Sequence, residues 1–339
     1  GVSGAARQVV ARVLAGRGAQ ARESATVYAP ANIALVKYWG KRDEALNLPV
    51  TGSLSISLGP LGSHVTLGRG AGATDDAMWL NGEALPAESS FARRASAYLD
   101  LFRPSADFRF ELRARNTVPT AAGFASSASG FAALAKAVDA LFGWGLTERE
   151  LSVLARLGSG SAARSLADGF VEWHAGVAAD GMDSFAERLA VTWPELRVGA
   201  LVVSAAEKAV GSRAGMRQTV ETCEFYREWP ARVARDLADL KGALAKKDFA
   251  ALGAVAEGNA LAMHALMAAT RPPLVYALPE TVAAMRSIWA ARGAGLALWF
   301  TMDAGPNVKL LFEAKDEADV RALFPGVQVV APFAGEDKL

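Results

Sequence analysis

Cysteine and histidine are scarce in this chain of 339 residues. Cys223 is the single cysteine, which excludes an intramolecular disulfide and a structural zinc site built from cysteines. The three histidines, His64, His174 and His264, lie far apart and show no spacing typical of metal ligands. The sequence therefore gives no sign of a metal centre held by these side chains.

An excess of one charge and a long apolar run are also lacking. The 36 basic and 35 acidic residues give a formal net charge of +1, unlike the strong basic excess typical of nucleic-acid-binding proteins. No uninterrupted apolar run approaches the ~20 residues that cross a bilayer. We therefore expect neither nucleic acid nor a membrane as a partner. The balance of 52% hydrophobic and 21% charged residues is that of a globular protein, and the length suffices for two domains.

Residues 1–22 contain four arginines and no acidic residue. Such a segment is typical of a transit peptide, and equally of a frayed basic helix. We favour the basic helix and treat residues 1–24 as an N-terminal extension. The segment lacks the apolar core of a secretion signal, so we do not expect secretion.

Strand-like and helix-like patterns mix along the rest of the chain without a steady βαβ rhythm, which predicts an α+β fold. A break at Trp193-Pro194 separates two domains, residues 25–195 and 196–339, that meet at a cleft. Asn81-Gly82 predicts a tight hairpin turn, and Thr147 with Glu150 predicts a capped helix start. Strands are expected at 26–29, 33–39, 54–58, 64–67, 108–115, 170–173, 198–204, 296–301, 308–312 and 327–330, and helices at 89–102, from the 119–130 stretch to about 141, and at 147–156, 215–222, 225–244, 249–269 and 279–291.

Small residues fill the stretch 119–130 between a predicted strand and a predicted helix. Backbone N–H groups in such a stretch can close around an anion, and the helix dipole favours negative charge there. Serine hydroxyls would add donors, or a ligand for a phosphate-bound Mg²⁺. The pattern is neither a Walker A loop nor the dinucleotide fingerprint. A small-residue helix start packed closely on a sheet explains the same composition equally well.

A second small-residue stretch, 158–165, contains Ser159, Ser161 and Arg164. These side chains could converge on an acidic substrate, with the arginine making two parallel hydrogen bonds. A flexible turn with a solvated arginine is the alternative. The loop 207–215 offers Lys208 and Arg213 either as further anion contacts or as ordinary loop residues.

Lys37 lies within the apolar segment 33–39. Burying a lysine is costly unless it meets an anion, although an edge strand would let its ammonium reach water. Asp303 lies in a turn between two apolar strands. Aspartate is common in turns for local reasons, so a catalytic role does not follow from this position alone.

Four of these stretches together, in this order and spacing, resemble the diphosphomevalonate decarboxylase family of the GHMP kinase superfamily. The resemblance covers nearly the whole chain from Thr26 onward. It rests on Asn32-Ile-Ala…Lys37-Tyr-Trp-Gly-Lys41, Pro119-Thr-Ala-Ala-Gly…Ala-Ser-Ser127, Gly158-Ser-Gly-Ser…Arg164-Ser165 and Asp303-Ala-Gly-Pro-Asn307.

The resemblance implies a GHMP kinase-like two-domain fold, with an N-terminal domain like ribosomal protein S5 domain 2 and the active site in the cleft between the domains. It implies ATP and Mg²⁺ as cofactors. The 3-hydroxyl of (R)-5-diphosphomevalonate would be phosphorylated, and loss of phosphate and CO₂ would give isopentenyl diphosphate and ADP in the mevalonate pathway of isoprenoid biosynthesis. A cytoplasmic homodimer is expected.

The same resemblance assigns roles to residues. Asp303 would orient the substrate hydroxyl and accept its proton, Arg164 would hold the substrate carboxylate, and Lys37 would complete this cluster. Other substrate contacts would be Asn32, Tyr38, Lys41, Ser159, Ser161, Ser212 and Arg213. ATP would be bound by Pro119, Ala122, Gly123, Ala125, Ser126, Ser127 and Ser129, with Ser127 also facing Mg²⁺.

Three positions depart from the family pattern. Gly211-Ser212 stands where many members have two serines, Val50-Thr51-Gly52 stands where an asparagine is common, and Glu207 replaces a common lysine. These changes leave room for a relative acting on 5-phosphomevalonate, or for a mevalonate-type kinase without decarboxylation.

Overall fold

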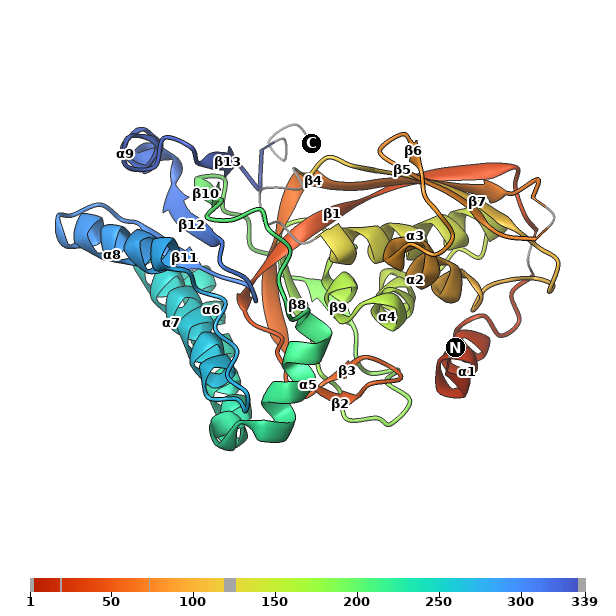
Figure 1. Ribbon diagram of the computed structural model, residues 1–339, viewed down its shortest axis with the longest axis horizontal. Coiled ribbons are helices and arrows are strands. Elements are labelled where there is room, and N and C mark those ends of the chain that lie inside the picture. The colour runs from red at the N-terminus through yellow and green to blue at the C-terminus, as the bar shows by residue number, and fades with distance from the viewer. Residues whose placement is uncertain (1–2, 19, 73, 119–125, 335–339) are drawn as a thin grey trace.

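The computed structural model describes the chain except residues 1–2, 19, 73, 119–125 and 335–339. It has two α+β halves that lie side by side (Figure 1). The first is built on a seven-stranded sheet and the second on a four-stranded sheet.

The first sheet has the order β6-β5-β7-β4-β8-β9, with β1 also paired to β4. Its centre is the long antiparallel pair of β1 and β4, joined in register from Ser24 and Gly68 to Val36 and Leu54. The strands are β1 (Ser24–Val36), β4 (Ser53–Arg69), β5 (Ala77–Leu80), β6 (Glu83–Ala84), β7 (Phe110–Asn116), β8 (Phe170–Trp173) and β9 (Ala186–Arg188).

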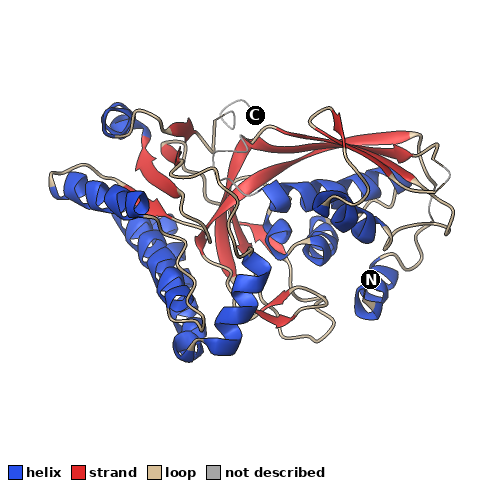
Figure 2. Ribbon diagram, viewed as in Figure 1, coloured by secondary structure: helices blue, strands red, loops and turns tan. Residues whose placement is uncertain are grey.

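Helices cover one face of this sheet (Figure 2). They are α2 (Ser90–Leu99), α3 (Ser126–Phe142) and α4 (Glu148–Gly158), followed by the 3₁₀ helix η2 (Gly160–Arg164). The predicted capping box is confirmed, since the side chains of Thr147 and Glu150 each bond the other residue's backbone N–H. The predicted hairpin is also confirmed: Asn81 and Gly82 adopt φ values of 52° and 86° between β5 and β6.

The N-terminal helix α1 (Gly4–Val13) packs against this first half. Ser3 caps it, and Ala6, Val9, Val10 and Val13 are buried in the same apolar cluster as α2 and α3. Its arginines face outward because the apolar side chains recur at helical spacing. The prediction of a frayed helix is therefore wrong in this structure.

The second half combines a sheet of order β11-β12-β10-β13 with long helices. Its elements are β10 (Leu196–Leu201), α5 (Ser212–Thr222), η3 (Glu224–Glu228), α6 (Trp229–Lys246), α7 (Phe249–Ala268), α8 (Pro279–Gly293), β11 (Trp299–Thr301), β12 (Val308–Glu313), η4 (Ala314–Asp316), α9 (Glu317–Leu323) and β13 (Gln328–Val330). In the described part of the chain, α7 alone is long and apolar enough to cross a membrane by length and composition, and half of that segment is buried inside the protein.

One apolar cluster joins the halves. It includes Ile33 of β1 and Ile56 of β4 from the first half, and Trp229 of α6, Leu252 of α7 and Val198 of β10 from the second. Burial of this shared core holds the ends of β1 and β4 against α6 and α7. Side chains from both halves therefore meet at a fixed junction.

The element predictions differ from the structure in several details. Predicted strands 198–204 and 296–301 correspond to β10 and to the shorter β11, predicted helix 225–244 is divided between η3 and α6, and β9 was not predicted. Segments 26–29 and 33–36 belong to one strand, β1, with irregular pairing near Pro30 and Ala34, whereas residues 37–39 lie beyond its end. Segments 54–58 and 64–67 belong to one strand, β4. Polar and glycine residues at the breaks suggested loops, but the neighbouring strands supply hydrogen bonds across them. The division at residues 195 and 196 stays a prediction.

Candidate active site

Lys37 and Asp303 form an ion pair at the junction of the halves. Lys37 follows the last residue of β1, and its Nζ lies 2.9 Å from Oδ1 of Asp303 in the turn between β11 and β12. The Lys37 side chain is 2% exposed, and it also donates to the Ala34 carbonyl. Of the two alternatives for Lys37, an anion partner is confirmed, and an ammonium that reaches water is wrong.

A second lysine approaches the same carboxylate. Nζ of Lys309, on β12, lies 3.5 Å from Oδ2 of Asp303. Burial alone would raise the pKa of Asp303, but the two ammonium groups outweigh it and hold that pKa well below its usual range. The carboxylate therefore stays ionised at neutral pH, which a group that accepts a proton requires.

Two residues of α7 form hydrogen bonds with the backbone of Lys37 and Asp303. Oδ1 of Asn259 accepts the backbone N–H of Lys37 at 2.8 Å, and Nε2 of His264 lies 2.8 Å from the backbone oxygen of Asp303. Because a carbonyl only accepts, Nε2 of His264 carries the proton. Burial lowers the pKa of His264 to about 4, so the ring is neutral at neutral pH.

Arg164 is buried beside the cluster at the end of η2. Its guanidinium donates to Oγ of Ser53 and, at 3.4 Å, to Oδ1 of Asn32. Burial lowers the pKa of Arg164 to about 10, opposed by the charge of Asp303, and the group remains a cation. Arg164 is therefore not the solvated arginine of a flexible turn.

Asn32 and Tyr38 belong to the same network. Asn32 also donates to Oγ of Ser165 at 2.6 Å, which ties β1 to the segment after η2. The hydroxyl of Tyr38 is buried and has no hydrogen-bond partner in the described part of the protein. Gly160 lies so close that a Cβ there would be 2.8 Å from that hydroxyl. An unsatisfied buried hydroxyl at this place is a ready partner for a bound polar molecule.

The backbone between Tyr38 and Lys41 requires a glycine. Gly40 has φ of +117°, and a Cβ there would lie 1.8 Å from Oη of Tyr226. That hydroxyl donates to the Trp39 carbonyl, and the Trp39 indole donates to Thr219 on α5. The second half thus anchors this loop of the first half.

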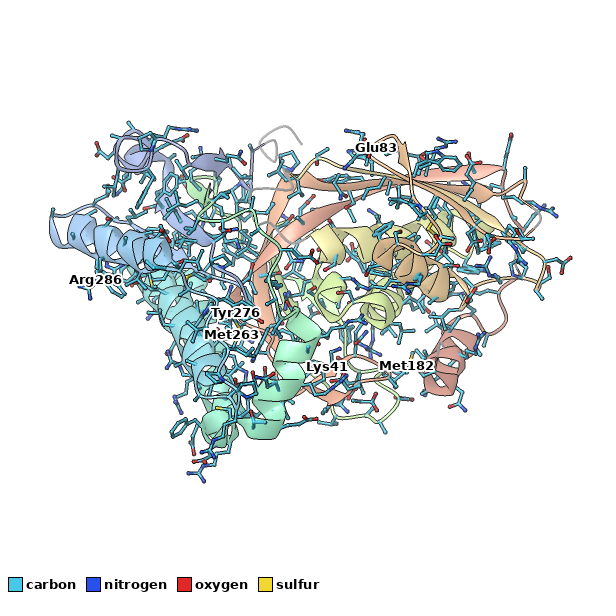
Figure 3. The ribbon with its side chains drawn as sticks, viewed as in Figure 1. Lys41, Glu83, Met182, Met263, Tyr276 and Arg286 are labelled. Atoms are coloured by element: carbon cyan, nitrogen blue, oxygen red, sulfur yellow. The ribbon has the colours of Figure 1, made fainter. Side chains whose placement is uncertain are left out.

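Lys41 lies where β2 (Lys41–Asp43) meets α5 (Figure 3). Its Nζ donates to Oδ1 of Asn47 at 2.8 Å, just before β3 (Leu48–Pro49), and lies 3.3 Å from Oε2 of Glu44. The amide of Asn47 in turn donates to the Arg156 carbonyl near the end of α4. Burial lowers the pKa of Lys41, and the carboxylate of Glu44 opposes that shift.

The first turn of α5 adds further polar groups. Lys208 donates to Oγ of Ser212 at 3.0 Å and to the carbonyl of Ala304, next to Asp303. Arg213 donates to the carbonyl of Gly158 at 3.0 Å. Ser159 and Ser161, with hydroxyls 3.4 Å apart, flank Gly160. The residues predicted to contact substrate are thus gathered from both halves around one place.

The predicted ATP-binding stretch is only partly described. Pro119, Ala122, Gly123 and Ala125 lie outside the described residues, as does the side chain of Ser126, where α3 begins. Ser127 is exposed in the first turn of α3. Ser129 is buried, with its hydroxyl 2.8 Å from Oγ of Ser63 on β4, which fits a helix start packed on the sheet.

The residues at the site that the sequence analysis did not single out are Lys309, Asn259 and His264. Lys309 had the same signal as Lys37, a lysine inside an apolar strand. No local pattern marks Asn259 or His264, because they reach the site through the packing of α7.

A separate cavity of about 550 Å³ lies between α1, α2 and the start of β7. Its charged groups satisfy one another: Arg103 pairs with Asp76 and Asp100, and Arg109 donates to backbone carbonyls. None of its described lining residues has a buried side-chain polar atom without a partner, so we do not assign the cavity a function.

The ionised acid, its lysines and the buried arginine form a charged site between two α+β halves, which is the kind of site found in enzymes that act on acidic small molecules. Family models match both halves. Residues 29–186 match the diphosphomevalonate decarboxylase-like N-terminal domain, and residues 198–332 match the mevalonate 5-diphosphate decarboxylase C-terminal domain.

Related proteins of known function indicate the same family as the family models. The chain is 38% identical over 332 residues to the diphosphomevalonate decarboxylase of Gibberella zeae, covering 91% of this chain and 86% of that protein. It is 39% identical over 305 residues to that of Danio rerio, covering 84% and 75%.

Solved structures share the fold. The mevalonate diphosphate decarboxylase of Staphylococcus aureus superposes with a TM-score of 0.85 at 38% identity, covering 91% of this chain and 95% of that chain. A structure of MDDEF in complex with MVAPP, AMPPCP and magnesium gives 0.84 at 38% identity, covering 91% and 96%. The chain belongs to the diphosphomevalonate decarboxylase family, and its fold is the two-domain GHMP kinase-like fold.

Proposed function

We propose that this protein catalyses the ATP-dependent decarboxylation of (R)-5-diphosphomevalonate to isopentenyl diphosphate, ADP, phosphate and CO₂, in the mevalonate pathway. The observation that carries the proposal is the Asp303 carboxylate, held ionised by Lys37 and Lys309 beside the buried Arg164 at the domain junction. Membership of the family supplies the substrate class.

The first step is phosphorylation of the tertiary hydroxyl. Asp303 orients the 3-hydroxyl and accepts its proton, while the oxygen forms a bond to the γ-phosphorus and ADP leaves with the electrons of the broken P–O bond. A tertiary alcohol is a poor nucleophile, so orientation of the reacting oxygen contributes more than the basicity of the carboxylate.

The second step is elimination. The C3–O bond breaks and phosphate leaves with its electron pair, so that positive charge develops at C3. The C1–C2 bond then breaks, its electrons form the new double bond between C2 and C3, and CO₂ leaves. Arg164 binds the substrate carboxylate and holds it for this step. The developing charge at C3 accepts the electrons, so no separate electron sink is needed.

The anionic tail of the substrate would lie between Lys41 and the start of α5. Lys41, Ser212 and Arg213 supply charge-assisted hydrogen bonds, and Ser159 and Ser161 add hydroxyls. The α5 N-cap, Gly211, makes no side-chain cap, so the helix leaves backbone N–H groups for a phosphate. Tyr38 and Asn32 complete the contacts.

ATP would place its phosphates at the start of α3. A helix of 17 residues presents its positive end there, with the exposed Ser127 hydroxyl in the first turn. The described residues hold no group of three or more His, Cys, Asp or Glu side chains that would bind a metal. Mg²⁺ bound through phosphate oxygens, water and Ser127 is consistent with that donor set.

We also propose a cytoplasmic homodimer without membrane or nucleic-acid partners. Half-burial of α7 and the even charge balance support the lack of such partners. Phe225 and Val275 are 61% and 69% exposed on the second domain, where a second copy would cover them. Light scattering during gel filtration, which gives the mass in solution, tests the dimer.

A substrate panel tests the reaction. Mevalonate, its 5-phosphate and its 5-diphosphate are each incubated with Mg-ATP, and both ADP and CO₂ are measured. The proposal predicts equal amounts of both products with the diphosphate. The alternative of a kinase without decarboxylation predicts ADP alone, and a relative acting on the monophosphate predicts both products from that compound instead.

A further inference from the structure

Lys309 lies on β12 among apolar side chains that are almost fully buried. Its neighbours Val308 and Leu310 are both inaccessible to solvent, and the Lys309 side chain is 4% exposed. A buried ammonium is costly unless an anion meets it. Asp303 is the one carboxylate that pairs with it among the described ion pairs, at 3.5 Å.

The two lysines contact different oxygens of the same carboxylate. Lys37 lies 2.9 Å from Oδ1, and Lys309 lies 3.5 Å from Oδ2. They come from different domains, since Lys37 follows β1 and Lys309 belongs to β12. Two contacts on opposite oxygens fix the rotation of the carboxylate, whereas one contact leaves it free to turn about Oδ1.

The backbone around Lys309 is also fixed. Lys309 pairs with Thr301 of β11 on one side and with Ala200 of β10 on the other. A residue in the middle strand of three cannot shift without breaking both ladders. The backbone that carries its ammonium is therefore fixed relative to the turn that contains Asp303.

We propose that Lys309 is a positioning residue of the decarboxylation: its ammonium holds the Asp303 carboxylate in the orientation in which that group receives the proton of the substrate hydroxyl. This inference rests on the proposed function. In this proposal Lys309 acts through Asp303, the carboxylate that it contacts, so its removal changes the chemical step more than substrate binding.

The test compares Lys309→Met, Lys309→Gln and Lys309→Arg with the wild type, using Mg-ATP and diphosphomevalonate. The neutral variants should lower kcat by about 10- to 100-fold at neutral pH, because a misplaced catalytic group costs this much, with KM changed by less than about twofold. Lys309→Arg keeps the charge and should retain most of kcat. The exposed Lys315→Met serves as a control and should behave as the wild type.

The pH profile separates positioning from a merely structural role. An opposite charge at this distance shifts a carboxyl pKa by about 1 to 3 units, so Lys309→Met and Lys309→Gln should lose activity at higher pH than the wild type on the acid side. The proposal is overturned if the folded neutral variants lose activity at the same acidic pH as the wild type. It is also overturned if Lys309→Arg lowers kcat as much as the neutral variants do. Unchanged kcat overturns it as well. If Lys309→Met does not fold, Lys309→Gln decides. Lack of turnover by the wild type contradicts the proposed function instead.

Discussion

The ammonium of Lys37 lies 2.9 Å from the carboxylate of Asp303, although 266 residues separate them in the chain. One belongs to the first domain and the other to the second. The pair therefore exists only when both domains fold and dock, and the shared apolar core supplies the energy for docking.

Asp303→Asn removes the group that accepts the proton but keeps its size. We expect kcat to fall by about 10² to 10⁴-fold, the usual contribution of a general base. The affinity for ATP, measured by calorimetry, should change by less than about twofold. The exposed Asp319→Asn provides the control. Near-normal turnover of Asp303→Asn would exclude this role for Asp303.

Arg164→Lys keeps the positive charge but removes the planar guanidinium. A single ammonium cannot bond Ser53, Asn32 and a substrate carboxylate in the same geometry. We expect kcat/KM to fall by about 100-fold, measured from initial rates over a range of diphosphomevalonate concentrations. Arg227→Lys, at an 82% exposed side chain, should have no effect. A silent Arg164→Lys would mean that Arg164 does not bind the carboxylate.

The sequence was sufficient for part of this site. The cost of burying Lys37 made an anion partner one of two alternatives, the other being an edge strand whose lysine reaches water, and the four motifs predicted which segments meet. The partner itself could not be derived from local patterns, because Asp303 in a turn is explained equally well by turn preferences. The same cost of burial applies to Lys309, which also lies within an apolar strand.

Other features depend on packing between distant segments. The continuity of β1 across Pro30 arises from pairing with β4, and the burial of α1 arises from contacts with α2 and α4. Asn259 and His264 reach the site because α7 packs against β1 and β11. Local propensity carries no information on such contacts.

Asn259→Ala tests the link between α7 and Lys37. Asn259 is fully buried, and its loss leaves the backbone N–H of Lys37 and the carboxylate of Asp236 each without one partner. We expect the free energy of unfolding in urea to fall by about 1 to 3 kcal/mol. Because Lys37 would be less firmly held, kcat should fall as well. Unchanged stability and unchanged kcat would contradict the link.

His264→Gln tests whether the neutral His264 ring makes the stability of the protein depend on pH. The folded pKa of His264, about 4, lies below the unfolded value of about 6.5, so protons bind the unfolded chain more strongly. The stabilisation is complete above about pH 6.5 and is lost as the pH falls towards 4, by on the order of 2–3 kcal/mol.

Glutamine keeps an N–H donor for the Asp303 carbonyl but does not titrate. Urea unfolding at pH 7 and pH 4.5 should therefore show a smaller loss of stability in His264→Gln than in the wild type. An equal loss in both proteins would show that His264 is not responsible.

The most direct measurement follows ADP and CO₂ together in one time course, with diphosphomevalonate and Mg-ATP, for the wild type and Asp303→Asn. We predict that the wild type forms both products in a 1:1 ratio and that the variant loses both in parallel, because proton transfer to Asp303 accompanies phosphorylation and phosphorylation precedes loss of CO₂. ADP without CO₂ from the wild type, or CO₂ formed at the normal rate by Asp303→Asn, would contradict this account.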